Sequence, residues 1–243
     1  MRVSRLYSSV ALSSGKTIAL DDEASHYIRT VLRLRKDTDL ILFNGNGCEY
    51  QCRVADVTRK VVMIAVGECS ERSVESPLNI TLGLSISRGD RMDMSVQKAV
   101  ELGVNTMTAL LTERCVVQLT DDKKLQRLIH WQKIVQHATE QSGRTQLPAL
   151  ASVEKLADWL PNQQGLKVFL DPYATTSLSG LKPENLHVTL LAGPEGGFSG
   201  AERDMAKAAG FIPVRLGARI LRTETASLAA LAAVQMLWGD FGL

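Results

Sequence analysis

The sequence has few of the features that mark secreted, metal-binding or membrane-spanning proteins. It has four cysteines in 243 residues, and no second Cys/His pair accompanies Cys48 and Cys52 to complete a zinc site. The four histidines show no ligand spacing, so no metal is expected. We expect reduced thiols in a cytoplasmic protein. No run of about 18 apolar residues exists and the first residues lack an apolar core, so neither a membrane span nor a signal peptide is expected.

The chain also lacks a strong charge of either sign. It has 28 Lys+Arg against 26 Asp+Glu, for a formal net charge of +2. Nucleic-acid-binding domains commonly carry a basic surface, so any such surface here must be a local patch. Arg29, Arg33, Arg35 and Lys36 form one basic cluster near the N-terminus. They are candidates for phosphate contacts, or they simply end a solvated helix with favourable dipole interactions.

Neither of the common phosphate-binding fingerprints, G-x-x-x-x-G-K-[ST] and G-x-G-x-x-G, is present at the glycine-rich loops. Instead, an apolar strand runs into Gly193-Pro194-Glu195-Gly196-Gly197, and Ser199 with Glu202 forms a capping box for a following helix. Glu195 would repel phosphates, which need donors and positive charge. The loop suits a nucleoside-like cofactor with a positive centre, such as S-adenosylmethionine, or it is merely a tight strand-to-helix turn.

A second glycine-bearing loop, Leu216-Gly217-Ala218-Arg219-Ile220-Leu221-Arg222, leads into an apolar helix expected over residues 225–238. Because this helix is apolar on all sides, we expect burial on most of them, partly by another subunit. The two arginines either serve a site or pair with Glu224 and other acids as structural ions. Loops at the carboxyl ends of strands are where open α/β sheets bind ligands.

The rest of the chain divides into two patterns. Residues 1–72 read as mostly β, with a hairpin turn at Asn44-Gly45-Asn46-Gly47 and one helix over 23–31. Residues 73–77 read as a linker. From residue 78 strands alternate with helices, which predicts an α/β domain with a parallel sheet. Strands are expected at 80–86, 104–111, 166–171, 186–192 and 212–216, with helices at 91–102 and 121–142.

The paired loops LAGPEGGFSGAE (191–202) and LGARILRTETA (216–226) resemble the SPOUT (α/β-knot) class of RNA methyltransferases. Three further blocks in matching order support the resemblance: His26–Arg33, Lys98–Val104 and Ala138–Arg144. Within the class, the chain is similar to the family that methylates N3 of a uridine in small-subunit (16S) ribosomal RNA. The resemblance covers nearly the full chain.

This resemblance implies an architecture and a set of partners. It implies a small PUA-like β-barrel for RNA binding over 1–72, and a methyltransferase domain over 78–243 with a C-terminal trefoil knot. S-adenosylmethionine would bind in the knot, active sites would lie at a homodimer interface, and the substrate would be ribosomal RNA within the assembled subunit. The cofactor-binding positions that it implies are Leu170, Leu191, Gly193, Gly196, Gly197, Leu216, Gly217 and Leu221.

Methylation of N3 requires loss of an imide proton and alignment of the nitrogen with the methyl group. Arg222 is the first candidate for catalysis, since a guanidinium can stabilise charge on the uracil oxygens or hold a phosphate. Glu195 and Glu224 are candidate bases or cofactor-orienting groups. Arg144 is expected to project at a loop edge after a helix that Gly143 caps, where it contacts RNA or a dimer partner, or is simply a surface arginine.

Two alternatives compete with an enzyme of this kind. One is a non-catalytic, dimeric RNA-binding protein on a knotted scaffold, which would not bind the cofactor. The other is a nicotinamide-dependent or other nucleotide enzyme, against which the missing phosphate-binding fingerprints and Glu195 count.

Overall fold

The computed structural model describes residues 3–115 and 119–242. The chain divides into two compact units, one formed by Met1–Val74 with Thr139–Leu147 and the other by Glu75–Ala138 with Pro148–Leu243. Each unit is described by itself below. The segment Thr139–Leu147 falls inside the domain expected over 78–243, yet it groups with the N-terminal unit.

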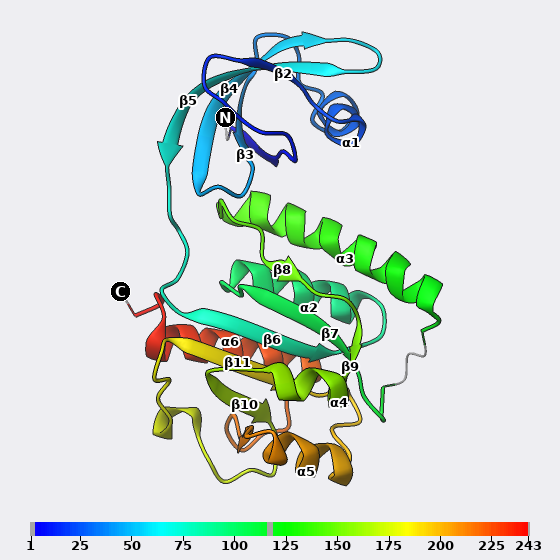
Figure 1. The fold of residues 1–243 in the computed structure, drawn as a ribbon, viewed down its shortest axis with the longest axis vertical. Coiled ribbons are helices and arrows are strands. Elements are labelled where there is room, and N and C mark those ends of the chain that lie inside the picture. Colours follow the sequence, from blue (N-terminus) through cyan, green and yellow to red (C-terminus); the bar gives the residue numbers. More distant parts are fainter. Residues whose placement is uncertain (1–2, 116–118, 243) are drawn as a thin grey trace. The chain divides into compact units, whose positions relative to one another are not determined.

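The N-terminal unit is a five-stranded sheet in the order β1-β3-β4-β5-β2 (Figure 1). Its elements are β1 (Ser4–Tyr7), β2 (Thr17–Ala19), α1 (Asp22–His26), a π-helical turn (Tyr27–Leu32), β3 (Asp39–Phe43), β4 (Cys48–Val57) and β5 (Val62–Glu71). The hairpin predicted at 44–47 is confirmed, since β3 and β4 pair antiparallel around it. The predicted helix is confirmed as α1 with the π-helical turn. Asp21 caps α1 by accepting a 2.8 Å hydrogen bond from the Ala24 amide.

The half-buried Arg5 ties the segment Thr139–Leu147 to this unit. Arg5 on β1 donates from Nε to Glu49 Oε1 at 2.9 Å and from a terminal nitrogen to the Glu140 carbonyl at 2.9 Å. The Tyr7 amide donates to Glu140 Oε1 at 3.0 Å. Hydrogen bonds of this kind are invisible in the local sequence pattern, which explains why the segment was assigned to the other domain.

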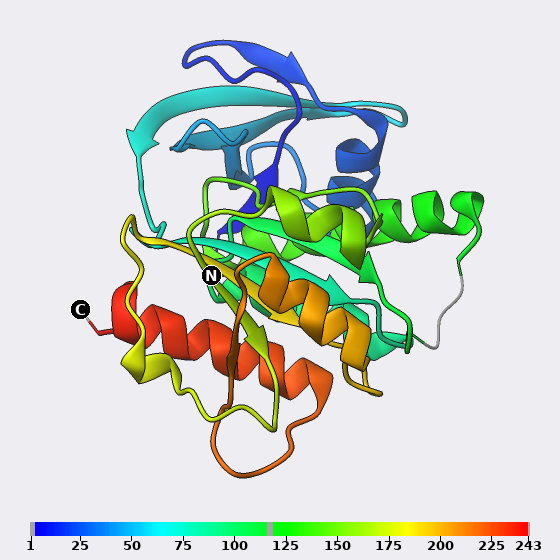
Figure 2. The same ribbon diagram turned by 60° about the horizontal axis from the view of Figure 1, so that its bottom comes forward.

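The second unit is built on a parallel sheet in the order β12-β10-β11-β6-β7-β8, with β9 also paired to β7 (Figures 1 and 2). The strands are β6 (Asn79–Ser85), β7 (Thr106–Leu111), β8 (Ala149–Leu150), β9 (Glu154–Lys155), β10 (Leu166–Leu170), β11 (His187–Ala192) and β12 (Ile212–Val214). Its helices are α2 (Asp90–Glu101), α4 (Leu156–Trp159), α5 (Gly200–Ala208) and α6 (Thr223–Trp238). The helix α3 (Asp121–Ser142) begins here and ends in the other unit. The five predicted strands and the parallel α/β class are confirmed. The two-residue strands β8 and β9 were not predicted.

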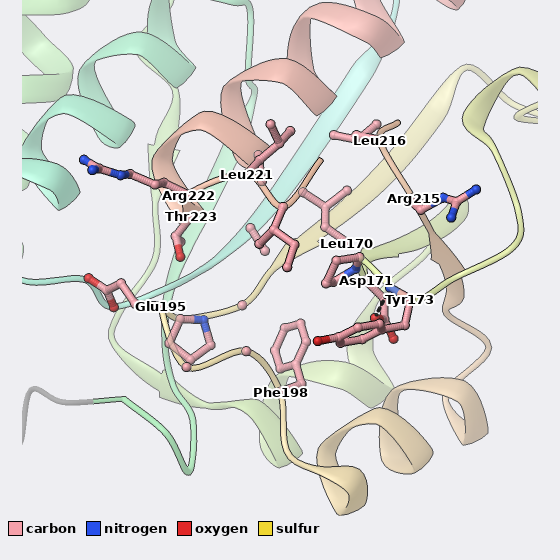
Figure 3. A pocket seen from close by; sticks show the side chains of 18 of the residues that line it. Leu170, Asp171, Tyr173, Glu195, Phe198, Arg215, Leu216, Leu221, Arg222 and Thr223 are labelled. Atoms are coloured by element: carbon pink, nitrogen blue, oxygen red, sulfur yellow. Dashed lines mark hydrogen bonds between the residues drawn. The ribbon is translucent and has the colours of Figure 1, made fainter. Parts of the chain in front are cut away.

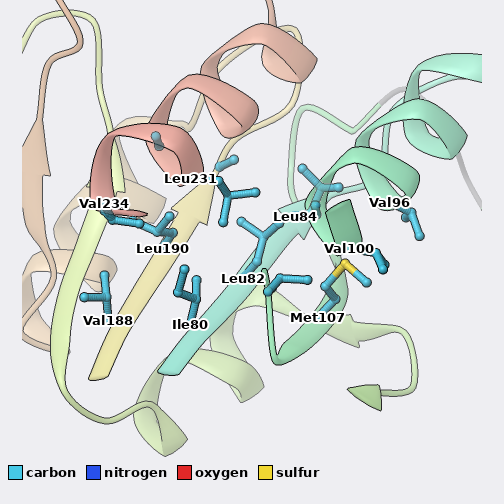
Figure 4. Packing of buried hydrophobic residues seen from close by; sticks show 14 of the residues in the cluster. Ile80, Leu82, Leu84, Val96, Val100, Met107, Val188, Leu190, Leu231 and Val234 are labelled. Atoms are coloured by element: carbon cyan, nitrogen blue, oxygen red, sulfur yellow. The ribbon is translucent and has the colours of Figure 1, made fainter. Parts of the chain in front are cut away.

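Helices cover both faces of this sheet because alternate residues of its strands point to opposite sides. On β11, Leu190 belongs to a core with α2, α3 and α6, whereas Leu191 belongs to a second core with α4 and α5. Figure 4 shows the first core, in which Leu231 and Val234 of α6 lie against the strands. In the part of the chain that the structure describes, no helix has the length and apolarity needed to cross a bilayer.

Candidate functional site

A cavity of about 530 Å³ lies at the carboxyl ends of the three adjacent strands β10, β11 and β12 (Figure 3). The loop after each strand contributes to its wall, as does the start of α6. The position agrees with the rule that open parallel sheets bind ligands outside the carboxyl ends of their strands. The volume falls within the range of about 300–1,000 Å³ that is usual for small-molecule sites.

The first loop follows β11 and is held in a fixed shape. The Gly197 amide donates to the Pro194 carbonyl at 2.8 Å, and Gly197 has φ of +65°, which favours glycine. Arg114 donates to the Gly196 carbonyl at 3.0 Å, and a Cβ on Gly196 would lie 3.2 Å from the Arg114 Cβ. By contrast, a Cβ on Gly197 would meet no protein atom within 4 Å. Gly197 is therefore the glycine at which a ligand can approach the loop backbone.

Glu202 fixes the start of α5 beside this loop. The predicted capping box is confirmed, since Ser199 Oγ accepts from the Glu202 amide at 3.1 Å and Glu202 Oε2 accepts from the Ser199 amide at 2.9 Å. Glu202 Oε1 also accepts from the Glu113 amide at 2.8 Å, and the residue is 4% exposed. One buried carboxylate therefore joins the first loop to the segment that carries Arg114.

The second loop, residues 215–222, follows β12. Leu216 and Leu221 are half-buried and line the cavity with Leu170, which gives it an apolar wall (Figure 3). In the part of the chain that the structure describes, the backbone N–H groups of residues 216–221 donate to no other protein group. Thr223, the first residue of α6, also lines the cavity. The loop therefore presents apolar side chains together with backbone donors that a ligand can use.

A third group of lining residues was missed by sequence reasoning. Asp171 is 8% exposed, accepts from the Tyr173 amide at 3.0 Å and lies 3.5 Å from an Arg203 nitrogen. The Arg203 guanidinium lies 5.5 Å from the Tyr173 ring centroid. The signal was available, because Asp171 is the last residue of a strand predicted over 166–171 and so lies at the same sheet edge as the glycine loops.

The cavity is lined by more positive than negative side chains. Its acidic residues are Asp171 and Glu195, and its arginines are Arg91, Arg114, Arg203, Arg215, Arg219 and Arg222. Glu195 lies 3.4 Å from Arg91 of α2, a partly exposed pair. The expected structural alternative, in which Arg219 and Arg222 pair with Glu224, is wrong for the described residues, since neither makes an ion pair there. The net charge of +2 therefore conceals a local basic patch.

Most of the predicted site residues converge on this cavity. The lining residues among them are Leu170, Gly193, Glu195, Gly196, Gly197, Leu216, Leu221 and Arg222. Leu191, Gly217 and Glu224 are not among the residues that line it. Leu191 points to the other face of the sheet and packs in the core beside Phe198. Glu224 is 7% exposed, and its Oε2 atom has no hydrogen-bond partner among the residues that the structure describes.

The predicted RNA-binding arginines do not form one group. Arg33 and Arg35 are exposed in the N-terminal unit. Arg29 is half-buried there and donates to the backbone carbonyls of Ser25 and Arg59. Arg144 is 5% exposed, so the expectation that it projects from a loop edge is wrong. It lies in the segment that packs within the N-terminal unit, directly after Gly143, whose φ of +84° fits the predicted helix cap.

Comparisons with known proteins match both units. Residues 74–235 match the family described as an RNA methyltransferase domain, and residues 20–62 match an RNA methyltransferase PUA domain. The chain is 37% identical over 242 residues to the ribosomal RNA small subunit methyltransferase E of Buchnera aphidicola subsp. Schizaphis graminum, covering 98% of each chain. It is 28% identical over 243 residues to the protein of the same name from Bacillus subtilis, covering 94% of this chain and 95% of that one.

Two solved structures are also similar over almost the whole chain. The first is a methyltransferase of Legionella pneumophila in complex with its bound cofactor S-adenosylmethionine, with a TM-score of 0.96 and 36% identity, covering 99% of this chain and 100% of that one. The second is a ribosomal RNA small subunit methyltransferase E of Neisseria gonorrhoeae bound to S-adenosylmethionine. It has a TM-score of 0.92 and 38% identity, with the same coverage.

Proposed function

The chain belongs to the family of RNA methyltransferases that carry a PUA domain, and from this premise we propose that it methylates N3 of one uridine in small-subunit (16S) ribosomal RNA. It is an S-adenosylmethionine-dependent enzyme that acts on small-subunit ribosomal RNA, like the relatives that it matches over nearly its full length. The choice of uridine N3 as the target atom is the part of this statement that goes beyond the family.

The observation that carries the proposal is the cavity at the carboxyl ends of β10, β11 and β12. Its residues fit S-adenosylmethionine in three respects. Leu170, Leu216 and Leu221 supply an apolar wall for a purine ring. The unused backbone donors of residues 216–221 can bind its polar edges. Gly197 leaves room for close approach at the first loop.

The acidic residues of the cavity fit the charge of this cofactor. Glu195 and the buried Asp171 can attract its positively charged groups or accept hydrogen bonds from its hydroxyls. The glycine loops carry neither of the common phosphate-binding fingerprints, which counts against a nicotinamide dinucleotide. The site therefore favours the methyltransferase over the nucleotide-dependent alternative.

When bound, S-adenosylmethionine supplies an electrophilic methyl group, which N3 takes up as it loses its proton. Arg222 is exposed at the cavity and makes no ion pair among the described residues, so its guanidinium is available to stabilise negative charge on the uracil oxygens. Glu195 lines the cavity and can orient the cofactor or accept the proton. Glu224 does not line the cavity, so the geometry favours Glu195 over Glu224 for either role.

We extend the proposal to assembly and substrate. The helix α6 leaves Met236 63% exposed and Leu237 44% exposed, and Phe241 beyond it is 49% exposed. An apolar surface of this kind supports a homodimer that covers α6. The same proposal includes four further points. They are the C-terminal knot, RNA binding by the PUA domain through Arg33 and Arg35, the assembled subunit as substrate, and the cytoplasmic location.

The deciding experiment is transfer of labelled methyl from S-adenosylmethionine to small ribosomal subunits and to free ribosomal RNA, with the product nucleoside identified by mass spectrometry. We expect 3-methyluridine. Another methylated nucleoside would refute the N3 assignment. Cofactor binding without transfer would refute the substrate, and absence of cofactor binding would favour the non-catalytic RNA-binding alternative.

The role of Arg222 has its own test. Arg222→Ala should abolish turnover with little change in the dissociation constant of S-adenosylmethionine, because the guanidinium acts on the uracil. A large loss of cofactor affinity with intact turnover would refute the role.

A further inference from the structure

The two most exposed large hydrophobic side chains in the described part of the chain both lie at this cavity. Ile220 in the second loop is 77% exposed, and Tyr173 after β10 is 73% exposed. In the same loop as Ile220, Leu216 and Leu221 are half-buried, and the exposed Leu186 and Phe241 of other segments are less exposed, at 46% and 49%. Solvent exposure of apolar surface beside a ligand site indicates a surface that a partner covers.

The side chains of the second loop lie in two layers, one against the cavity and one exposed. Leu216 and Leu221 are half-buried against the cavity, whereas Arg215, Arg219 and Arg222 are exposed. Figure 3 shows Arg215 and Arg222 at opposite sides of the cavity, with the leucines between them. The apolar inner layer suits the cofactor. The exposed outer layer therefore faces whatever lies over the cofactor.

The charges of the outer layer identify the chemistry of that partner. Among the described residues, Arg215, Arg219 and Arg222 make neither an ion pair nor a side-chain hydrogen bond, in contrast to Arg91 and Arg203, which face acids. Three free guanidinium groups on one short loop favour a polyanion, and arginine matches the geometry of phosphate. Exposed apolar surface among phosphate-binding arginines is typical of contacts to unstacked bases.

The reaction requires such a contact. N3 lies on the base-pairing edge of uracil, and it must reach the methyl group inside a cavity of about 530 Å³. Enzymes that modify a base take the nucleotide out of its stack, and some nucleic-acid-binding proteins insert apolar side chains between neighbouring bases. This step rests on the function proposed above.

We propose that Ile220 is a wedge that occupies the place vacated by the target uridine, while Arg215 and Arg219 bind the phosphates of the neighbouring nucleotides. Ile220 is thus a positioning residue: it does not touch the reacting atoms, and it holds the RNA strand in the conformation that admits the uridine. The loop 215–222 serves the cofactor on its inner side and the RNA on its outer side.

The test compares Ile220→Ala with Ile220→Leu and with Leu125→Ala, a matched change at a side chain of α3 that is 59% exposed. Methyl transfer to small-subunit ribosomal RNA should fall in kcat/KM by roughly tenfold or more in Ile220→Ala, because the apolar contact with the RNA is lost. Ile220→Leu should restore most of the activity, and Leu125→Ala should match the wild type. The melting temperature and the dissociation constant of S-adenosylmethionine should stay unchanged in every variant.

A second arm tests the phosphate contacts. Arg219→Gln should lower the slope of log affinity for ribosomal RNA against log salt concentration by about one, the value expected for one lost phosphate contact. Arg127→Gln, at an exposed arginine of α3, is the control and should leave the slope unchanged.

Three results would overturn the inference while leaving the proposed function standing. They are wild-type activity in Ile220→Ala, loss of cofactor affinity in that variant, and dissociation of a dimer in that variant. The last result would show that a second copy of the chain covers Ile220. Absence of methyl transfer by the wild-type protein would instead overturn the proposed function, and this inference with it.

Discussion

Replacement of Glu202 by alanine should destabilise the second unit, because this buried carboxylate makes hydrogen bonds in two directions. It accepts from the Ser199 amide at 2.9 Å and from the Glu113 amide at 2.8 Å, and it is 4% exposed. A hydrogen bond to a charged group contributes about 1.5–3 kcal/mol. Glu113 is exposed, so water can replace its bond in part.

The expected loss in the free energy of unfolding is therefore about 3 kcal/mol, which in a domain of this size lowers the melting temperature by about 6–12 °C. Chemical and thermal denaturation measure both quantities. Binding of S-adenosylmethionine, followed by calorimetry, should weaken as well, since Glu202 joins the first loop to the segment that carries Arg114. The free energy of unfolding of Glu202→Gln should lie between those of the wild type and Glu202→Ala, because an amide has a single acceptor oxygen.

Asp204→Ala is the matched control on the same helix. The Asp204 side chain is 81% exposed and lies 3.8 Å from Lys207, so its removal should change the unfolding free energy by no more than about 0.5 kcal/mol. A loss below about 1 kcal/mol in Glu202→Ala would refute the argument that this carboxylate holds the loop.

Three further outcomes are expected. Gly197→Ala should weaken S-adenosylmethionine binding in calorimetry. Its Cβ would occupy the open space through which a ligand approaches the loop, and the backbone φ of +65° disfavours a side chain there. Unchanged affinity would contradict the binding role of this loop. Burial lowers the pKa of His187 below its ordinary 6.5, so the unfolded state binds more protons and stability should fall as pH drops below about 6.5; His187→Gln should reduce this slope in denaturation curves. Met236→Glu should dissociate the proposed homodimer in light-scattering measurements, because it places a charge on the apolar α6 surface.

Much of the second unit could be predicted because its signals are local. The alternation of apolar strands with helices follows from burial on both faces of a parallel sheet, and the capping box at Ser199 follows from two residues three apart. The glycine loops could be placed at one edge of the sheet, because each follows a strand. For these features the sequence pattern and the structure agree.

The contacts between side chains in the site could not be predicted from the local sequence pattern. Asp171 and Arg203 approach each other from two separate elements, and Arg91 reaches Glu195 across more than a hundred positions of the chain. Leu191 was assigned to the cofactor site although strand alternation points it to the opposite core. Arg144 was expected at the surface and is buried, because β1 binds the segment around it through Arg5 and Tyr7.

The fold class, the position of both glycine loops and the family resemblance could all be read from the amino-acid sequence, because they depend on residue types at short spacing. Other features became visible only in the folded chain: which side chains share the cavity, which of its arginines have no acidic partner among the described residues, and that Ile220 is exposed among them. Contacts between distant segments depend on how whole elements pack, and no local pattern specifies that packing.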